Sequence, residues 1–144
     1  MATAPGLTGK PTRYLLDTNI CIYIAKGQPL AVRHRFENHT LQELAMSTIT
    51  VGELRFGAEK SQARERALAT IDQLVQMIQP CALPMSAAEH YGHVRASLQL
   101  QGLPIGNNDL WLAAHALAEG WTLVTNNTRE FCRVPGLRFE NWVE

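Results

Sequence analysis

The sequence contains little of what marks secreted or membrane-spanning proteins. Its 144 residues include three cysteines, Cys21, Cys81 and Cys132, which are far apart and form no CxxC pair. Isolated cysteines in odd number argue against a disulfide scaffold or a zinc site and favour a reducing cytoplasm. No apolar run is long enough for a signal peptide or a membrane anchor. We therefore expect a cytoplasmic protein that does not bind a membrane.

An excess of charge of either sign is also missing, because 13 Lys and Arg residues balance 13 Asp and Glu residues. Attraction to nucleic acid by bulk charge is therefore disfavoured, and any polyanion would have to be bound by a local group of basic side chains. The chain also lacks a Walker loop, a G-x-G-x-x-G fingerprint and a G-x-S-x-G elbow. These absences disfavour nucleotide-cofactor enzymes and serine hydrolases.

What the sequence does contain is an alternation of short apolar runs with longer segments of helical period. The 46% of apolar residues suffices for one compact core, and the length leaves no room for a second domain. We expect residues 1–12, which include Pro5, Gly6, Gly9 and Pro11, to be a disordered tail and residues 13–144 to form one domain. Helices between successive buried strands favour a parallel sheet that is covered on both faces.

The expected helices and strands follow from the spacing of apolar residues and from the Gly and Pro residues that interrupt this pattern. Strands are expected at residues 14–16, 44–49, 81–83, 121–124 and 137–143. Helices are expected at residues 19–26, from there to about 38, and at 50–60, 63–79, 87–100 and 107–119. Ligands of parallel sheets bind at the carboxyl ends of the strands, so the residues that follow each strand are the candidates for a site.

Three acidic residues are the candidates for such a site: Asp17 and Glu53 follow apolar runs, and Asp109 follows a glycine-containing loop. Asp17 and Asp109 are two of only three aspartates in the chain, and each precedes a predicted helix. Each has a simpler explanation: Asp17 as a helix N-cap, Thr50 and Glu53 as a capping box, and Asp109 as a charge near a helix N-terminus. Three caps have no reason to converge, however. Three carboxylates at one sheet edge would form the oxygen environment that Mg²⁺ or Mn²⁺ requires.

A fourth polar position follows the strand expected at residues 121–124. Asn127 could act as an amide ligand or hold a water molecule, and Glu130 could add a negative charge, although no spacing rule shows that it points inward. The alternative is that these are ordinary turn residues.

These positions lie in four segments that form a recognisable set. The segments are Leu15-Leu16-Asp17-Thr18-Asn19, Thr50-Val51-Gly52-Glu53-Leu54, Ile105-Gly106-Asn107-Asn108-Asp109 and Thr125-Asn126-Asn127-Thr128-Arg129-Glu130-Phe131. In order and spacing, from Tyr14 to Trp142, the chain resembles the PIN-domain toxins of the VapC family. The resemblance implies a three-layer α/β/α sandwich, an Mg²⁺- or Mn²⁺-dependent endoribonuclease that inhibits translation and growth, a VapB-like antitoxin as partner, and a homodimer.

The resemblance also implies roles for individual residues. Asp17, Glu53 and Asp109 match the acidic positions of the family, and Thr18, Asn19 and Thr48 match the accompanying polar ones. Many PIN domains have a fourth aspartate near the position of Asn127, so occupancy of a second metal site is in doubt here. The resulting hypothesis is that Asp17 and Asp109 hold the metal, that Glu53 binds it directly or through water and orients the nucleophile, and that Asn127 positions water.

Substrate and partner contacts are less clear from sequence. Arg55 and Lys60, together with Arg64 and Arg66, could form a basic rim for RNA, but the same residues suit a solvated helix face, and no interleaved aromatic residue suggests base stacking. His115 is expected to be structural rather than part of the site. Apolar residues of the early helices could bind an antitoxin or a second subunit, or could simply be buried: Ile20, Ile22, Tyr23, Ile24 and Leu30.

Two other functional classes use carboxylates at the edge of a parallel sheet. A phospho-receiver normally has paired acids after its first strand and a late lysine, whereas this chain has one acid there and no lysine in the late segment. A metal-free acidic module that binds a basic partner is the other alternative. Metal titration and RNA cleavage would distinguish either of them from the nuclease.

Overall fold

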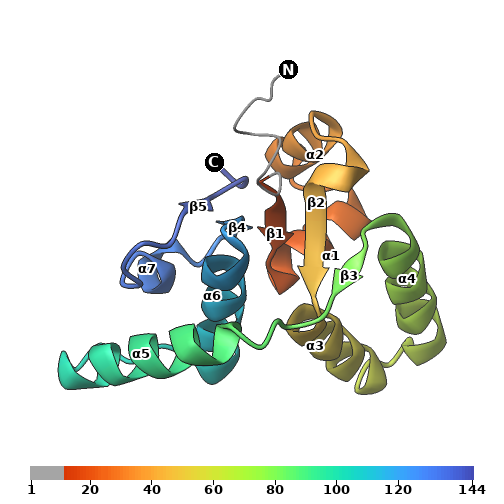
Figure 1. Cartoon of the computed structure of the whole chain (residues 1–144). Helices are drawn as coiled ribbons and strands as arrows, with labels where there is room; N and C mark the ends of the chain where they lie inside the picture. Colours follow the sequence, from red (N-terminus) through yellow and green to blue (C-terminus); the bar gives the residue numbers. More distant parts are fainter. Residues whose placement is uncertain (1–11) are drawn as a thin grey trace.

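The structure of the protein, a computed structural model, describes residues 12–144. The expected disordered tail, residues 1–12, lies outside the described residues except for Thr12. Helices cover both faces of a central five-stranded sheet (Figure 1). The predicted three-layer α/β/α sandwich is therefore confirmed.

The sheet has the strand order β3-β2-β1-β4-β5, and all neighbouring strands are parallel. The strands are β1 (Tyr14–Leu16), β2 (Leu44–Ser47), β3 (Pro80–Cys81), β4 (Thr122–Val124) and β5 (Phe139–Glu140). In the central register, Leu15 of β1 pairs with Ala45 of β2 and with Leu123 of β4. Because the strands run in one direction, the residues that follow them meet at one edge of the sheet.

The helices lie close to the expected ranges. They are α1 (Thr18–Lys26), α2 (Leu30–Glu37), α3 (Thr48–Glu59), α4 (Arg64–Met77), α5 (Ala87–Leu100), α6 (Asn107–Glu119) and α7 (Thr128–Phe131), with a short 3-10 helix at Leu41–Glu43. No helix within residues 12–144 has the length and apolar character needed to cross a membrane.

The core is divided by the sheet into two clusters, as the alternation of side chains along a strand requires. Leu15 belongs to the cluster on the face covered by α5 and α6. Its neighbour Leu16 belongs to the cluster on the opposite face, covered by α1 to α4. Both residues are fully buried. The central strand β1 is thus fixed from both sides, which holds the residue after it, Asp17, in a defined position.

The strands differ from the expected ranges more than the helices do. The strand expected at 137–143 is only Phe139–Glu140, the strand expected at 81–83 is Pro80–Cys81, and β2 is shorter than the expected 44–49. Strand β2 ends at Ser47, and α3 begins at Thr48, because the Ser47 side chain accepts a hydrogen bond from the amide of Ile49 and so caps the helix there. The alternative explanation of Thr50 and Glu53 as a capping box is therefore wrong, since both lie inside α3. A capping box does occur in the chain, between Thr40 and Glu43 at the 3-10 helix.

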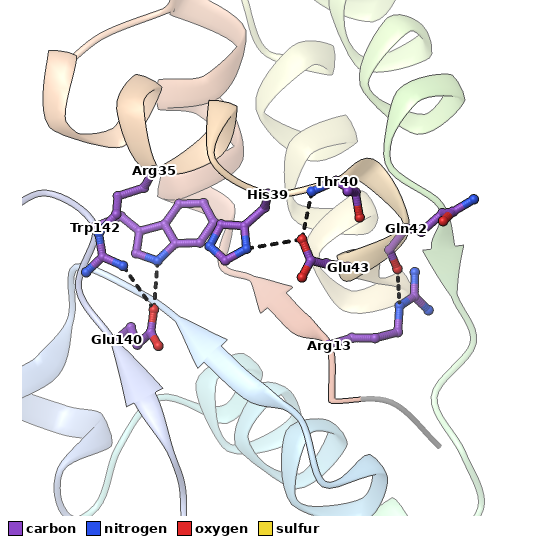
Figure 2. A network of polar contacts seen from close by, with 8 residues as sticks. All are labelled: Arg13, Arg35, His39, Thr40, Gln42, Glu43, Glu140 and Trp142. Carbon is purple, nitrogen blue, oxygen red and sulfur yellow. Dashed lines mark hydrogen bonds and ion pairs between the residues drawn. The ribbon is translucent and has the colours of Figure 1, made fainter. Parts of the chain in front are cut away.

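A polar and aromatic cluster, shown in Figure 2, attaches the C-terminal segment to the sandwich. The fully buried Trp142 stacks on His39 with ring centres 5.1 Å apart, and its indole N–H donates to Glu140 at 3.0 Å. Glu140 also pairs with Arg35 of α2 at 3.3 Å. The segment after β5 is thereby fixed against α2 and the loop that follows it.

Candidate active site

Asp17 follows β1 directly and is the N-cap of α1, as its simpler explanation predicts. One carboxylate oxygen accepts from the amide of Thr18 at 2.6 Å, and the other accepts from the hydroxyl of Thr125 at 2.8 Å. Burial raises the pKa of the Asp17 carboxyl, and these two hydrogen bonds oppose the rise. The fold therefore keeps an acid, only 7% exposed, at the carboxyl edge of its central strand.

Glu53 reaches the same place from the second turn of α3. Its Oε1 accepts from the hydroxyl of Thr18 at 2.6 Å, and its Oε2 accepts from the side-chain amide of Asn108 at 3.2 Å. Thr18 is thus a link between two acids, because its amide contacts Asp17 and its hydroxyl contacts Glu53. The carboxylate is held between the start of α1 and the start of α6.

Asp109 lies in the first turn of α6. The side-chain amide of Asn127 donates to its Oδ2 at 3.3 Å, and Glu130 of α7 is near enough to act on the same carboxyl. Burial, followed by the charges of Asp17 and Glu130, raises the pKa of Asp109 to about 7. Glu130 therefore does point inward, which the sequence left open, and both Asn127 and Glu130 lie close to this acid.

These side chains share a pocket of about 420 Å³ at the carboxyl edge of the sheet. Burial is the main cause of the raised pKa values of Asp17 and Asp109; the charge of Glu53 contributes to both, and that of Asp17 contributes to the pKa of Asp109. We call this pocket the acid pocket. It is lined by Asp17, Thr18, Asn19, Glu53, Asp109, Asn126 and Asn127.

The donor chemistry of the acid pocket fits a hard divalent cation. Carboxylate and amide oxygens are the ligands that Mg²⁺ and Mn²⁺ prefer, and a cation would relieve the repulsion between the acids. Within residues 12–144, however, no three His, Cys, Asp or Glu side chains form a preformed metal-binding group. The carboxylate oxygens are instead directed to Thr18, Asn108, Thr125 and Asn127. A cation would have to compete with these hydrogen bonds for its ligands.

Several sequence candidates lie outside the acid pocket. The hydroxyl of Thr48 donates to the carbonyl of Cys81 at 3.1 Å, beside β3. Arg55 pairs with Asp72 of α4 at 3.7 Å, and Arg64 pairs with both Glu59 and Glu65. Neither arginine lines the acid pocket.

Two other basic or titratable candidates have defined surroundings. Lys60 lines a neighbouring pocket that shares Thr18 and Glu53 with the acid pocket. His115 is fully buried, and its Nδ1 lies 2.9 Å from the Ser47 hydroxyl. It thereby supports the residue that caps α3, which agrees with the expected structural role.

Two residues of the site were not singled out from the sequence. Thr125 is fully buried after β4 and joins Asp17 to the amide of Asn127, while Asn108 holds Glu53. Thr125 occupies the position after β4 that Asp17 occupies after β1. That equivalence is a signal that could have identified it.

Comparison with known proteins gives one consistent result. Residues 14–137 match the PIN domain model. The chain is 48% identical over 130 residues to the tRNA(fMet)-specific endonuclease VapC of Shigella flexneri, which covers 90% of this chain and 98% of the relative. It is 47% identical over 131 residues to the ribonuclease VapC of Haemophilus influenzae strain 86-028NP, covering 91% and 98% of the two chains. Among solved structures, a DNA-bound VapBC complex from Salmonella typhimurium matches with a TM-score of 0.85 and 42% identity, covering 92% of this chain and 99% of that one.

Proposed function

This chain belongs to the PIN-domain family and, within it, to the VapC ribonucleases, and we propose that it is a Mg²⁺- or Mn²⁺-dependent endoribonuclease. The single observation that supports the metal dependence most directly is the acid pocket itself. Asp17, Glu53 and Asp109 come from three separate elements and line one cavity, where burial and mutual repulsion raise the pKa of Asp17 and Asp109.

In this proposal, Asp17 and Asp109 hold the cation, and Glu53 binds it directly or through water. When bound, the cation would supply positive charge that offsets the negative charge of a phosphodiester, and it would lower the pKa of a water molecule so that the water can lose a proton and attack the phosphorus as hydroxide. The remaining steps belong to the chain. Thr18 holds the carboxylate of Glu53 so that it can orient the attacking water, and the amide of Asn127, beside Asp109, positions that water. One of the two ester oxygens of the phosphodiester then leaves as its phosphorus–oxygen bond breaks, and it takes up a proton from solvent.

The test is cleavage of cellular RNA in the presence of Mg²⁺, with the new ends mapped. Asp17→Asn removes one charge from the acid pocket and should abolish discrete cuts. Asp72→Asn is the matched control, because Asp72 is an exposed aspartate of α4 that pairs with Arg55 outside the pocket. We expect the Asp72 variant to cut like the wild type. Unchanged cleavage by Asp17→Asn, with its fold intact, would refute the assignment.

We also propose that the chain is the toxin of a VapBC pair, which inhibits translation and growth when its antitoxin is absent. A groove of about 580 Å³ between α1, α3 and α4 is suited to an apolar antitoxin segment. It begins at Thr18 and Glu53, which also line the acid pocket, and continues over Ile22 and Ile71. An antitoxin arginine entering from this groove would replace the cation's charge. Inhibition that survives substitution of every basic residue of the antitoxin would contradict this mechanism.

The apolar residues of the early helices contribute unequally to such a surface. Ile20 is fully buried, so of the two alternatives left open by the sequence, burial applies to this residue. Ile22, Tyr23 and Ile24 are half-buried, whereas Leu30 is 60% exposed. We further propose that the protein is a cytoplasmic homodimer. Sedimentation of the antitoxin-free protein should give the mass of two chains.

A further inference from the structure

We propose that Phe56 and Lys60 form a subsite that binds one nucleotide of a single-stranded RNA substrate, with the base stacked on the Phe56 ring and a phosphate next to Lys60. The inference rests on the proposed ribonuclease function and extends it to how the substrate is held. The subsite lies on α3, one turn beyond Glu53, and its residues belong to a pocket of about 650 Å³ that adjoins the acid pocket. We call it the Phe56 pocket.

Phe56 is unusual among the large apolar side chains of the helices that surround the acid pocket. Its side chain is 66% exposed, although an aromatic ring of this size is normally a core residue. Glu53 and Thr18 line both the Phe56 pocket and the acid pocket, so a ligand on the ring is continuous with the candidate reaction centre. An exposed aromatic ring beside a nuclease site has the geometry of a base-stacking platform.

Lys60 supplies the charge that distinguishes a nucleotide from any other flat apolar ligand. Lys60 is the C-cap of α3, four residues after Phe56, and its ammonium lies 4.7 Å from the centre of the Phe56 ring. Within residues 12–144 no carboxylate pairs with it, whereas Arg55 and Arg64 of the predicted basic rim are both engaged in ion pairs. Arg66, the fourth residue of the predicted rim, lines the groove between α1, α3 and α4 and not the Phe56 pocket. Lys60 is therefore the cation of the rim that is available to a phosphate in the Phe56 pocket.

The glycines of the Phe56 pocket point to the same use. Gly52 and Gly57 lie inside α3, neither has a positive φ, and a Cβ at either would meet no atom within 4 Å. Glycine inside a helix is destabilising by about 0.5–1 kcal/mol relative to alanine. Neither packing nor backbone conformation within the chain explains why glycine occupies these two positions. A groove that must admit a flat ligand next to the helix backbone would explain it.

The experiment measures binding of labelled single-stranded RNA by fluorescence anisotropy, in the Asp109→Asn background so that the RNA stays intact. Phe56→Ala should weaken binding roughly 5- to 150-fold, the loss that corresponds to one stacked base. Phe56→Trp should retain the affinity. Leu100→Ala is the matched control, because Leu100 is 89% exposed on α5 outside the pocket. It should bind like the background protein.

The decisive arm repeats the titration with an abasic RNA of the same length. The background protein should lose affinity for it by about the Phe56→Ala factor, and Phe56→Ala should lose nothing further. If Phe56→Ala loses the same affinity on normal and on abasic RNA, the subsite is overturned. It is also overturned if Phe56→Ala leaves RNA binding unchanged but changes the mass of the protein in sedimentation, since Phe56 would then contact a second copy of the chain. Wild-type cleavage of cellular RNA is measured in parallel. Cleavage without a Phe56 effect rejects the subsite alone, whereas absence of both cleavage and binding rejects the proposed function.

Discussion

At the scale of single residues, the acid pocket is held together by neutral donors rather than by cations. Asp17 is bound by Thr18 and Thr125, and Asp109 is bound by Asn127. Among residues 12–144, no ion pair involves Asp17, Glu53 or Asp109. Hydrogen bonds orient these carboxylates without cancelling their charge, which leaves the charge available to a bound cation.

The raised pKa of Asp109, about 7, leads to a prediction on pH dependence. A carboxyl group whose pKa is higher in the folded than in the unfolded protein binds its proton more tightly when folded, so it stabilises the fold at low pH. That contribution is lost as the pH rises through about 7. The melting temperature of the metal-free protein, measured in EDTA, should therefore fall between about pH 5 and about pH 8.

Asp109→Asn tests whether the fall in melting temperature comes from the Asp109 carboxyl. The variant lacks the titrating group, so its melting temperature should depend less on pH. Saturating Mg²⁺ should reduce the fall in the wild type, since a ligand of the folded state stabilises it. A wild-type melting temperature that does not change over this range would contradict the assigned cause.

A second prediction at this scale concerns Lys60, the C-cap of α3, and Arg64, the first residue of α4. Lys60→Ala should reduce the slope of log affinity for single-stranded RNA against log salt by about 0.7, the value for one phosphate contact. Arg64→Ala should leave the slope unchanged, because Arg64 is already paired with Glu59 and Glu65. Anisotropy titrations at several salt concentrations measure both. A larger change for Arg64 than for Lys60 would place the phosphate contact elsewhere.

At the scale of elements, glycine serves opposite purposes in different helices. Gly120 ends α6 with a φ of 72°, and its amide donates to the carbonyls of the last turn. Gly52 lies within α3, without a positive φ and with open space around it. Gly52→Ala should therefore raise the free energy of unfolding by about 0.5–1 kcal/mol, whereas Gly120→Ala should lower it. Urea unfolding of the two variants measures this. Destabilisation by Gly52→Ala would mean that the glycine has a structural role.

The elements also show which parts of the fold the sequence could predict. Helix α6 was predicted at residues 107–119 and extends from Asn107 to Glu119, because Gly120 can adopt the left-handed conformation that ends it. The start of α3 was placed too late because an apolar run through Ile49 resembles a strand, and only the hydrogen bond accepted by Ser47 decides the boundary. The four-residue helix α7 is too short to give a period.

In the candidate site, too, some features could be predicted from local sequence and others could not. The positions after strands could be recognised locally, and the structure brings Asp17, Glu53 and Asp109 into one pocket. Long-range partners could not be predicted, because they depend on how separate elements pack. Thr125 reaches Asp17 across 108 positions of sequence, and Asn108 reaches Glu53 across 55. Phe56 lies between Arg55 and Lys60 and is one helical turn from Lys60, a local signal that could have identified the pair, although no aromatic residue interleaved with the basic side chains was expected from the sequence.

At the scale of the whole molecule, the C-terminal segment is held against α2 and the loop that follows it. Figure 2 shows Trp142 and His39 in face-to-face contact, between the Glu140–Arg35 pair and the Glu43 side chain. Trp142 also belongs to the core cluster of α1 to α4, although it is the third residue from the C-terminus. The last strand and the residues after it are thus part of the sandwich.

We predict that Trp142→Ala lowers the free energy of unfolding by about 3–5 kcal/mol, the typical loss for a large buried aromatic residue. Trp142→Phe keeps most of the packing and loses the hydrogen bond to Glu140, so it should have a clearly smaller effect. Urea unfolding compares the two. A loss for Trp142→Ala no larger than that of an exposed control such as Leu100→Ala would show that the C-terminal segment contributes little to the fold.

The most direct test of the central claim is a calorimetric titration of the metal-free protein with Mn²⁺. The acid pocket predicts saturable binding by the wild type and by Asp72→Asn, and no detectable binding by Asp109→Asn. Absence of saturable binding in the wild type, or equal binding by Asp109→Asn, would contradict the claim that these acids hold a cation and would favour a metal-free acidic binding protein.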